Sequence, residues 1–115
     1  MTSRDRQYLL DILLNAEDAL TFIRGASFDD LRTNTMLRKA VLHSLTILGE
    51  AAGRIGEASE AEVPGLPWRR MKNLRNVIVH DYEGVNLPII WKIVTEELPV
   101  VVAVLNPLFP ERPKP

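Results

Sequence analysis

Apolar residues recur at intervals of three and four along most of this chain, and this spacing constrains the fold more than any other feature. The stripes run from Leu9 to Ile23, from Leu37 to Ile55, from Trp68 to Ile78 and from Ile90 to Leu108. Residues three or four apart share one face of an α-helix, whereas a strand needs strict alternation. The sequence therefore predicts an all-α fold, an antiparallel bundle of four to five helices.

Polar caps and glycine mark the ends of the first helices. Thr2 with Asp5, and Ser27 with Asp30, are hydroxyl caps followed three residues later by a carboxylate, a pattern typical of helix starts. Gly25 lies between them and favours the left-handed turn that follows a helix. We expect one helix before Gly25 and another after Ser27.

Prolines and glycines divide the rest of the chain. The helix after Ser27 is expected to be broken or capped again near Asn34 and to end between Gly53 and Gly56. The polar stretch 57–62 is predicted to be a loop by composition. Pro67 suits the first turn of a third helix, and Pro99 is expected to kink a fourth.

The size and composition favour one domain. The chain has 115 residues, 46% of them apolar, which is enough for a single core. We predict one helical domain over residues 1–109 and an extended or disordered proline-rich tail over 110–115. No stretch approaches the ~18 apolar residues of a membrane span, and no export signal is evident, so a cytoplasmic location is expected.

Charge limits the ways in which this chain contacts nucleic acid. The formal net charge is −1, so any contact with RNA must come from a local patch. The densest patch is formed by Arg69, Arg70, Lys72 and Arg75. A solvated helix face is the simpler interpretation of these charges taken alone.

The most concentrated polar chemistry lies between Arg75 and Tyr82. Asn76 and His80 are one helical turn apart and share a face, whereas Arg75 and His80 diverge by about 140° on a straight helix. The two side chains can reach one small substrate only if the helix ends between them or a second subunit completes the site.

The arginine and histidine suit RNA cleavage without a metal. Histidine exchanges protons near neutral pH, and arginine is a permanent cation whose donors match phosphate oxygens. His80 would handle a proton of the ribose 2′-hydroxyl or of the leaving oxygen, Arg75 would stabilise charge on the phosphate, and Asn76 would orient His80 or the phosphate. By itself, an arginine five residues before a histidine is common, and an ordinary helix end explains it.

The wider sequence resembles the HEPN domains of the HepT-like (DUF86) family. The resemblance is carried by residues 67–85, PWRRMKNLRNVIVHDYEGV, by LGEAA at 48–52, and by Trp91 and EELP at 96–99. It spans nearly the whole chain except the proline tail. The arrangement of arginine, asparagine, histidine and tyrosine in this setting is quite specific to that family.

This resemblance implies a HEPN-like homodimer with the motif near the subunit interface, and a metal-independent endoribonuclease that is the toxin of a type VII-like toxin–antitoxin pair. It also implies an antitoxin with a nucleotidyltransferase (MNT) fold, which in related systems adds AMP to the motif tyrosine, here Tyr82. Such a modification would place phosphate beside Arg75 and His80. The alternative is a non-catalytic HEPN module that binds and regulates a nucleotidyltransferase.

The remaining polar residues carry weaker hypotheses. Glu50 lies in the family-like second helix and is a candidate partner of Arg75 or Arg54, although a solvent-facing role explains it equally well. His43 is expected at the surface or at an interface. With two histidines and no cysteine in the chain, we expect no metal site and no cofactor.

Overall fold

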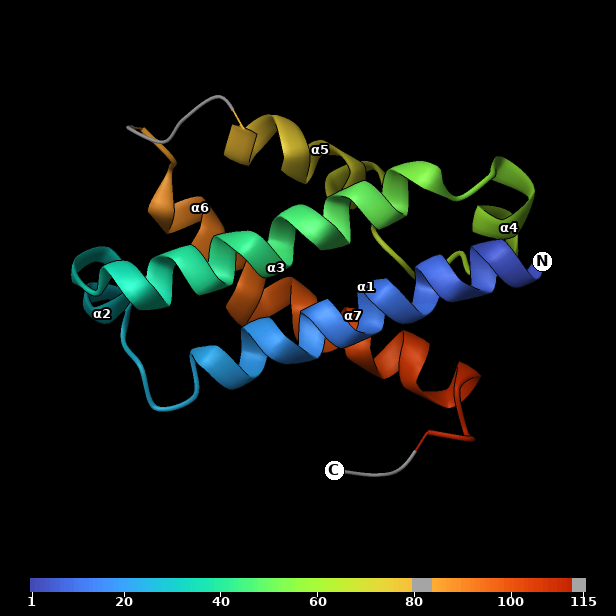
Figure 1. Cartoon of the computed structure of the whole chain (residues 1–115), viewed down its shortest axis with the longest axis horizontal. Helices are drawn as coiled ribbons and strands as arrows, with labels where there is room; N and C mark the ends of the chain where they lie inside the picture. Colours follow the sequence, from blue (N-terminus) through green and yellow to red (C-terminus); the bar gives the residue numbers. More distant parts are fainter. Residues whose placement is uncertain (80–83, 113–115) are drawn as a thin grey trace.

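The computed structural model describes residues 1–79 and 84–112. Two long helices, α1 (Ser3–Phe22) and α3 (Thr35–Arg54), lie side by side and are joined through the short α2 (Phe28–Thr33). In Figure 1, α5 (Trp68–Val79) lies along the other edge of α3, and the C-terminal helices cross behind this layer. The described residues contain no strand, which confirms the all-α bundle.

The predicted helix starts are confirmed by their capping bonds. The Thr2 hydroxyl accepts from the Asp5 amide at 2.9 Å, and Ser27 and Asp30 form a reciprocal capping box. Gly25 has a φ of 77°, a left-handed conformation that suits glycine. Asn34 ends α2 and caps α3 by accepting from the Leu37 amide at 3.0 Å, so the predicted second cap is also confirmed.

The loop prediction for residues 57–62 is wrong. This stretch forms α4 (Glu57–Glu62), and tertiary contacts explain why a polar segment is helical here. The buried Ser59 hydroxyl donates to the Asp5 carboxylate at 2.6 Å, and Glu60 pairs with Lys72. Both partners lie far away in the sequence, so local composition could not indicate them.

The fourth predicted helix is interrupted before Pro99. It consists of α6 (Leu87–Lys92), the π-helical turn η1 (Ile93–Glu97), α7 (Leu98–Leu105) and the 3-10 turn η2 (Asn106–Leu108). In the π-turn, the Leu98 amide donates to the Ile93 carbonyl, one residue beyond the α-helical partner. Proline has no amide to donate, so Pro99 disturbs the regular bonding of the turn before it.

The core joins all of these helices. Fully buried side chains come from both long helices and from α2, α6 and α7: Leu9, Ile12, Leu13, Leu31, Leu45, Leu48, Ile90, Leu98 and Leu105. Together with the buried Met71 and Leu74 of α5, they belong to one continuous cluster. Every predicted stripe contributes to this cluster, as expected of amphipathic helices packed face to face.

The start of the tail is held against α1. Glu111 pairs with Arg6 at 2.6 Å, and Arg112 pairs with Glu17. The Arg6 guanidinium also lies 4.5 Å from the centre of the Phe109 ring. Residues 110–112 form a turn and a bend, in which the Arg112 amide donates to the Phe109 carbonyl at 3.2 Å. The expectation of an extended or disordered tail is therefore wrong for these residues, and residues 113–115 lie outside the described part.

Candidate functional site

The helix α5, which carries Arg75 of the motif, packs closely against Gly49 of α3. A Cβ atom added at Gly49 would lie 3.1 Å from the Met71 carbonyl oxygen, 3.2 Å from the Leu74 Cβ and 3.5 Å from the Arg75 amide nitrogen. The absence of a side chain at Gly49 lets the two backbones approach closely. The position of Arg75 thus depends directly on this crossing.

The start of α5 is fixed by a partly buried hydrogen bond. The Trp68 indole N–H donates to the Val63 carbonyl at 2.9 Å, and the Met71 amide donates to the Pro67 carbonyl at 3.0 Å. The helix begins at Trp68, so Pro67 lies one residue before the predicted first turn, and its carbonyl accepts the first bond of the helix. Met71 and Leu74 are buried beneath it, which orients the polar face of α5 outward.

The predicted site residues that the structure describes are all at the surface. Arg75, Asn76 and Glu50 are exposed. The Asn76 amide donates to the Asn73 side-chain oxygen at 3.1 Å. Within the described residues, Arg75 and Glu50 are in no ion pair, so the guanidinium of Arg75 is not neutralised by a carboxylate there.

His80 and Tyr82 lie outside the described residues. The helix α5 is described as far as Val79. The prediction that Arg75 and His80 act on the same phosphate therefore stays a prediction, as do the roles of both residues. His43 is exposed on α3, at the surface as expected.

Two of the three further RNA-binding candidates are already paired with carboxylates. Lys72 pairs with Glu60 of α4, and Arg70 pairs with Glu97 of η1. A phosphate would have to compete with these carboxylates. Arg69 is exposed and is in no ion pair among the described residues.

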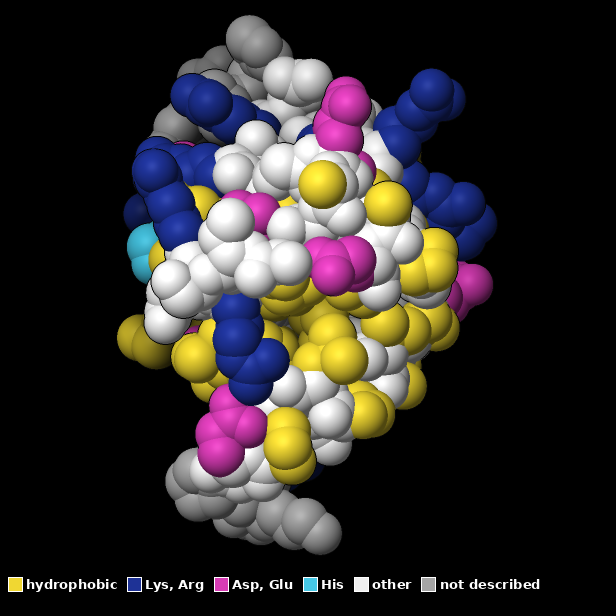
Figure 2. All heavy atoms as spheres, turned by 90° about the vertical axis from the view of Figure 1, so that its right-hand side faces the viewer, with side chains coloured by type: hydrophobic (Ala, Val, Ile, Leu, Met, Phe, Trp, Pro, Cys, Tyr) yellow, Lys and Arg dark blue, Asp and Glu magenta, His cyan; other side chains and the backbone are white. Residues whose placement is uncertain are grey.

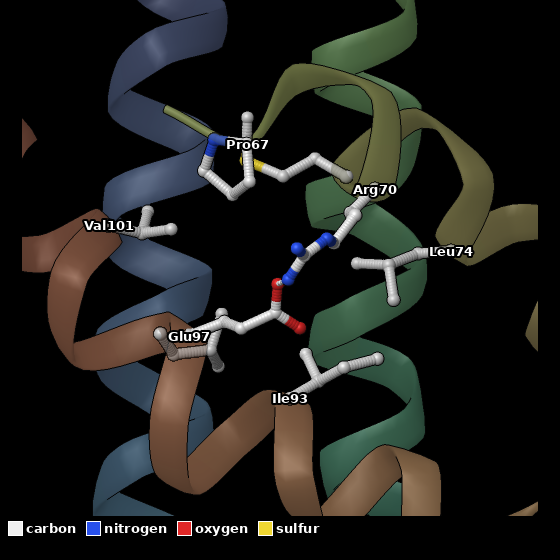
Figure 3. A pocket seen from close by; sticks show the side chains of 8 residues that line it. Pro67, Arg70, Leu74, Ile93, Glu97 and Val101 are labelled. Carbon is white, nitrogen blue, oxygen red and sulfur yellow. Dashed lines mark hydrogen bonds and ion pairs between the residues drawn. The ribbon is translucent and has the colours of Figure 1, made fainter. Parts of the chain in front are cut away.

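The Arg70 pair spans an apolar hollow. Figure 3 shows Arg70 and Glu97 pointing toward one another across it. Its lining is almost entirely apolar: Pro67, Met71, Leu74, Ile93, Leu98 and Val101. The two charged residues of the lining, Arg70 and Glu97, pair with each other, so the hollow does not extend the candidate site.

A second polar cluster was not predicted from the sequence. The Arg4 Nε donates to the Tyr8 hydroxyl at 3.2 Å, and the guanidinium lies 5.8 Å from the centre of the Tyr8 ring. This hydrogen bond, with a further contribution from Arg54, lowers the pKa of the Tyr8 phenol from its ordinary value of 10.0. The four-residue spacing of Arg4 and Tyr8 was the available signal, but nothing local points to Arg54.

The described residues offer no metal site and no membrane span. No group of three or more histidine or acidic side chains in this part of the chain could hold a metal ion. None of the helices described is long and apolar enough to cross a membrane.

Comparison with known proteins identifies relatives over most of the chain. "Putative RNase MJ1380" of Methanocaldococcus jannaschii is 36% identical over 102 residues, covering 88% of this chain and 94% of that protein. "Probable ribonuclease HepT" of Thermococcus cleftensis is 33% identical over 99 residues, covering 86% and 90% of the two chains. No solved structure gives a significant match. The model of the family described as ribonuclease HepT-like matches residues 12–108, so the chain belongs to the ribonuclease HepT-like family.

Proposed function

We propose that this protein is a metal-independent endoribonuclease that acts as the toxin of a toxin–antitoxin pair. The observation that carries the proposal is the exposure and free charge of Arg75 among the described residues. It is an exposed guanidinium on a helix whose backbone is seated against Gly49, and no carboxylate among the described residues neutralises it. Membership of a ribonuclease-named family supports an RNA substrate.

The proposed chemistry needs one cation and one group that transfers protons. The ribose 2′-hydroxyl attacks the adjacent phosphorus, the bond from phosphorus to the 5′-oxygen breaks, and the products are a 2′,3′-cyclic phosphate and a 5′-hydroxyl. His80 takes the proton of the attacking hydroxyl or supplies the one that the leaving oxygen needs. Arg75 stabilises the negative charge that builds up on the phosphate oxygens, and Asn76 orients His80 or the phosphate.

A homodimer belongs to the proposal because of helix geometry. On a straight helix, Arg75 and His80 diverge by about 140°, so one subunit is expected to use the arginine together with the histidine of its partner. A nucleotidyltransferase partner that adds AMP to Tyr82 would place phosphate beside this pair and block the site.

The test is RNA cleavage by the purified chain in the presence of a chelator. We expect cleavage to persist, Arg75→Ala to lower the rate about 10²- to 10³-fold, and His80→Ala to lower it about 10²- to 10⁴-fold. Arg24→Ala is a matched control, since Arg24 is also exposed and is in no ion pair among the described residues.

Equal cleavage by the wild-type protein and both motif variants, at equal thermal stability, would refute the proposed chemistry. The partner is tested separately, by mass spectrometry after incubation with the nucleotidyltransferase and ATP. The wild-type chain is expected to gain the mass of AMP, and Tyr82→Phe is expected to remain unchanged.

A further inference from the structure

Two cations of α5 lie on the same side of this helix. Lys72 and Arg75 are three residues apart, so their directions differ by about 60° around the helix axis and their Cβ atoms lie about 5–6 Å apart. Both residues are exposed. Arg70 diverges from Arg75 by about 140° and lies on the opposite side of the buried stripe formed by Met71 and Leu74. Lys72 is therefore well placed to contact the same RNA strand as Arg75.

In the free protein, a carboxylate of α4 holds Lys72. The Lys72 Nζ lies 2.5 Å from a carboxylate oxygen of Glu60. The Glu60 side chain is only 18% exposed, so dissolved salt screens this pair less than it screens a fully exposed one. The carboxylate and a phosphate oxygen of RNA are alternative acceptors for the same ammonium group.

The backbone of α4 is held in place on both sides of Glu60. The buried Ser59 hydroxyl donates to the Asp5 carboxylate at 2.6 Å. The Glu62 carboxylate lies 3.0 Å from the amino group of Met1. The helix α4 thus presents Glu60 to α5 from a fixed backbone, and only the Glu60 side chain has to move when the pair opens.

The acids of α4 oppose the approach of RNA to this side of α5. Three of the six residues of α4 are glutamates. Figure 2 looks at the end of the molecule where α4 lies, and it shows acidic side chains between two groups of Lys and Arg side chains. A phosphate that reaches Lys72 comes close to these carboxylates, and their repulsion lowers its affinity.

We propose that Lys72 binds an RNA phosphate next to Arg75 and that Glu60 is a built-in competitor, which the RNA must displace. This inference rests on the proposed function, which supplies RNA as the ligand, and it deepens that function by adding a phosphate contact and a device that limits affinity. In the complex, Lys72 donates to the phosphate beside the one held by Arg75, and the Glu60 carboxylate turns to solvent. Contacts with phosphate do not read sequence, so the competition acts on every RNA that enters the site.

The test measures binding of a 2′-O-methyl RNA oligonucleotide, which cannot be cleaved by attack of the 2′-oxygen, by fluorescence anisotropy at several salt concentrations. Glu60→Gln is expected to raise the affinity roughly threefold to tenfold, because the RNA no longer has to break the pair or to meet its carboxylate. In the wild-type protein a phosphate replaces a carboxylate on Lys72, so this contact releases few counterions. Once Lys72 is free, the slope of log affinity against log salt should become steeper by about 0.7.

Glu97→Gln is the matched control. It removes the same negative charge and also frees a cation of α5, because Glu97 pairs with Arg70. Arg70 lies on the other side of the helix, so Glu97→Gln is expected to raise the affinity less than about twofold and to leave the slope unchanged. In a Lys72→Gln background, Glu60→Gln should no longer make the slope steeper.

The outcomes separate the competition from the catalytic proposal. Equal gains in affinity and slope for Glu60→Gln and Glu97→Gln would reduce the effect to net charge and overturn the inference. An unchanged or lower affinity of Glu60→Gln would also overturn it, because the buried Ser59 contact still holds α4 in that variant. If the expected differences are found but the wild-type protein cleaves no RNA, the proposed chemistry fails alone. If RNA is cleaved but the variants bind equally, the competition fails alone.

Discussion

Gly49 and Gly53 offer a matched pair of substitutions on one helix. Both glycines lie in the last turns of α3, and replacing either with alanine adds a single methyl group. At Gly53 the added Cβ meets nothing within 4 Å, whereas at Gly49 it meets the Met71 carbonyl oxygen at 3.1 Å and the Leu74 Cβ at 3.2 Å. The pair therefore compares the same chemical change in open space and against α5.

The expected magnitudes follow from helix propensity and overpacking. Alanine stabilises a helix interior by up to about 1 kcal/mol relative to glycine, and less near a helix end. Gly53→Ala should therefore stabilise the protein by about 0.5 kcal/mol. Gly49→Ala gains a similar stabilisation from helix propensity, but overpacking lowers its free energy of unfolding by about 1–3 kcal/mol. The added methyl group meets the backbone of α5 and a buried side chain, and these atoms can move away only if α5 shifts.

Thermal unfolding followed by circular dichroism measures this difference. For a domain of this size, 1 kcal/mol corresponds to about 4 °C in Tm, so Gly49→Ala is expected to melt roughly 4–12 °C below Gly53→Ala. Because the shift of α5 also moves Arg75, Gly49→Ala should lower RNA cleavage at temperatures where it is fully folded. A Tm for Gly49→Ala equal to or above that of Gly53→Ala would refute the close crossing of α3 and α5.

Two further predictions concern the end of the molecule near α4. In a Tyr82→Phe background Tyr8 is the remaining tyrosine, and its ultraviolet titration should give a pKa below 10.0. Arg54→Ala should raise this pKa, because a cation that favours the phenolate is lost. An unchanged pKa would contradict the influence of Arg54 on Tyr8. Ser59→Ala should cost about 1–2 kcal/mol in urea unfolding, since it removes a buried hydrogen bond to the Asp5 carboxylate. In an Asp5→Asn background the cost should be smaller, and an equal cost would show that the bond adds no stability.

Part of the candidate site could be predicted from the sequence, and part could not. The helix that bears Arg75 was predicted from the stripe formed by Trp68, Met71 and Leu74, and the structure places that arginine on its exposed face. Which cations are available to phosphate was not predictable. Arg70 and Lys72 look equivalent to Arg75 in the sequence, but carboxylates 27 and 12 residues away neutralise them.

The starts of α1, α2 and α3 were determined by the sequence itself. The caps at Thr2, Ser27 and Asn34 act on amides three residues away, so each is complete within one turn of chain. The apolar stripes likewise need only the period of the helix to define which face is buried. These features depend only on residues within one or two helical turns of each other, so they can be recognised in the sequence.

Only the tertiary structure decided the helical state of residues 57–62 and the influence of Arg54 on the Tyr8 phenol. The first depends on contacts of Ser59 and Glu60 with other helices, and the second on the antiparallel packing of α1 against α3. Both bring together groups at least 12 residues apart, and the free energy of such contacts arises only once the core has aligned the helices. Local sequence patterns do not indicate how the helices pack against each other, so these features could be found only in the folded chain.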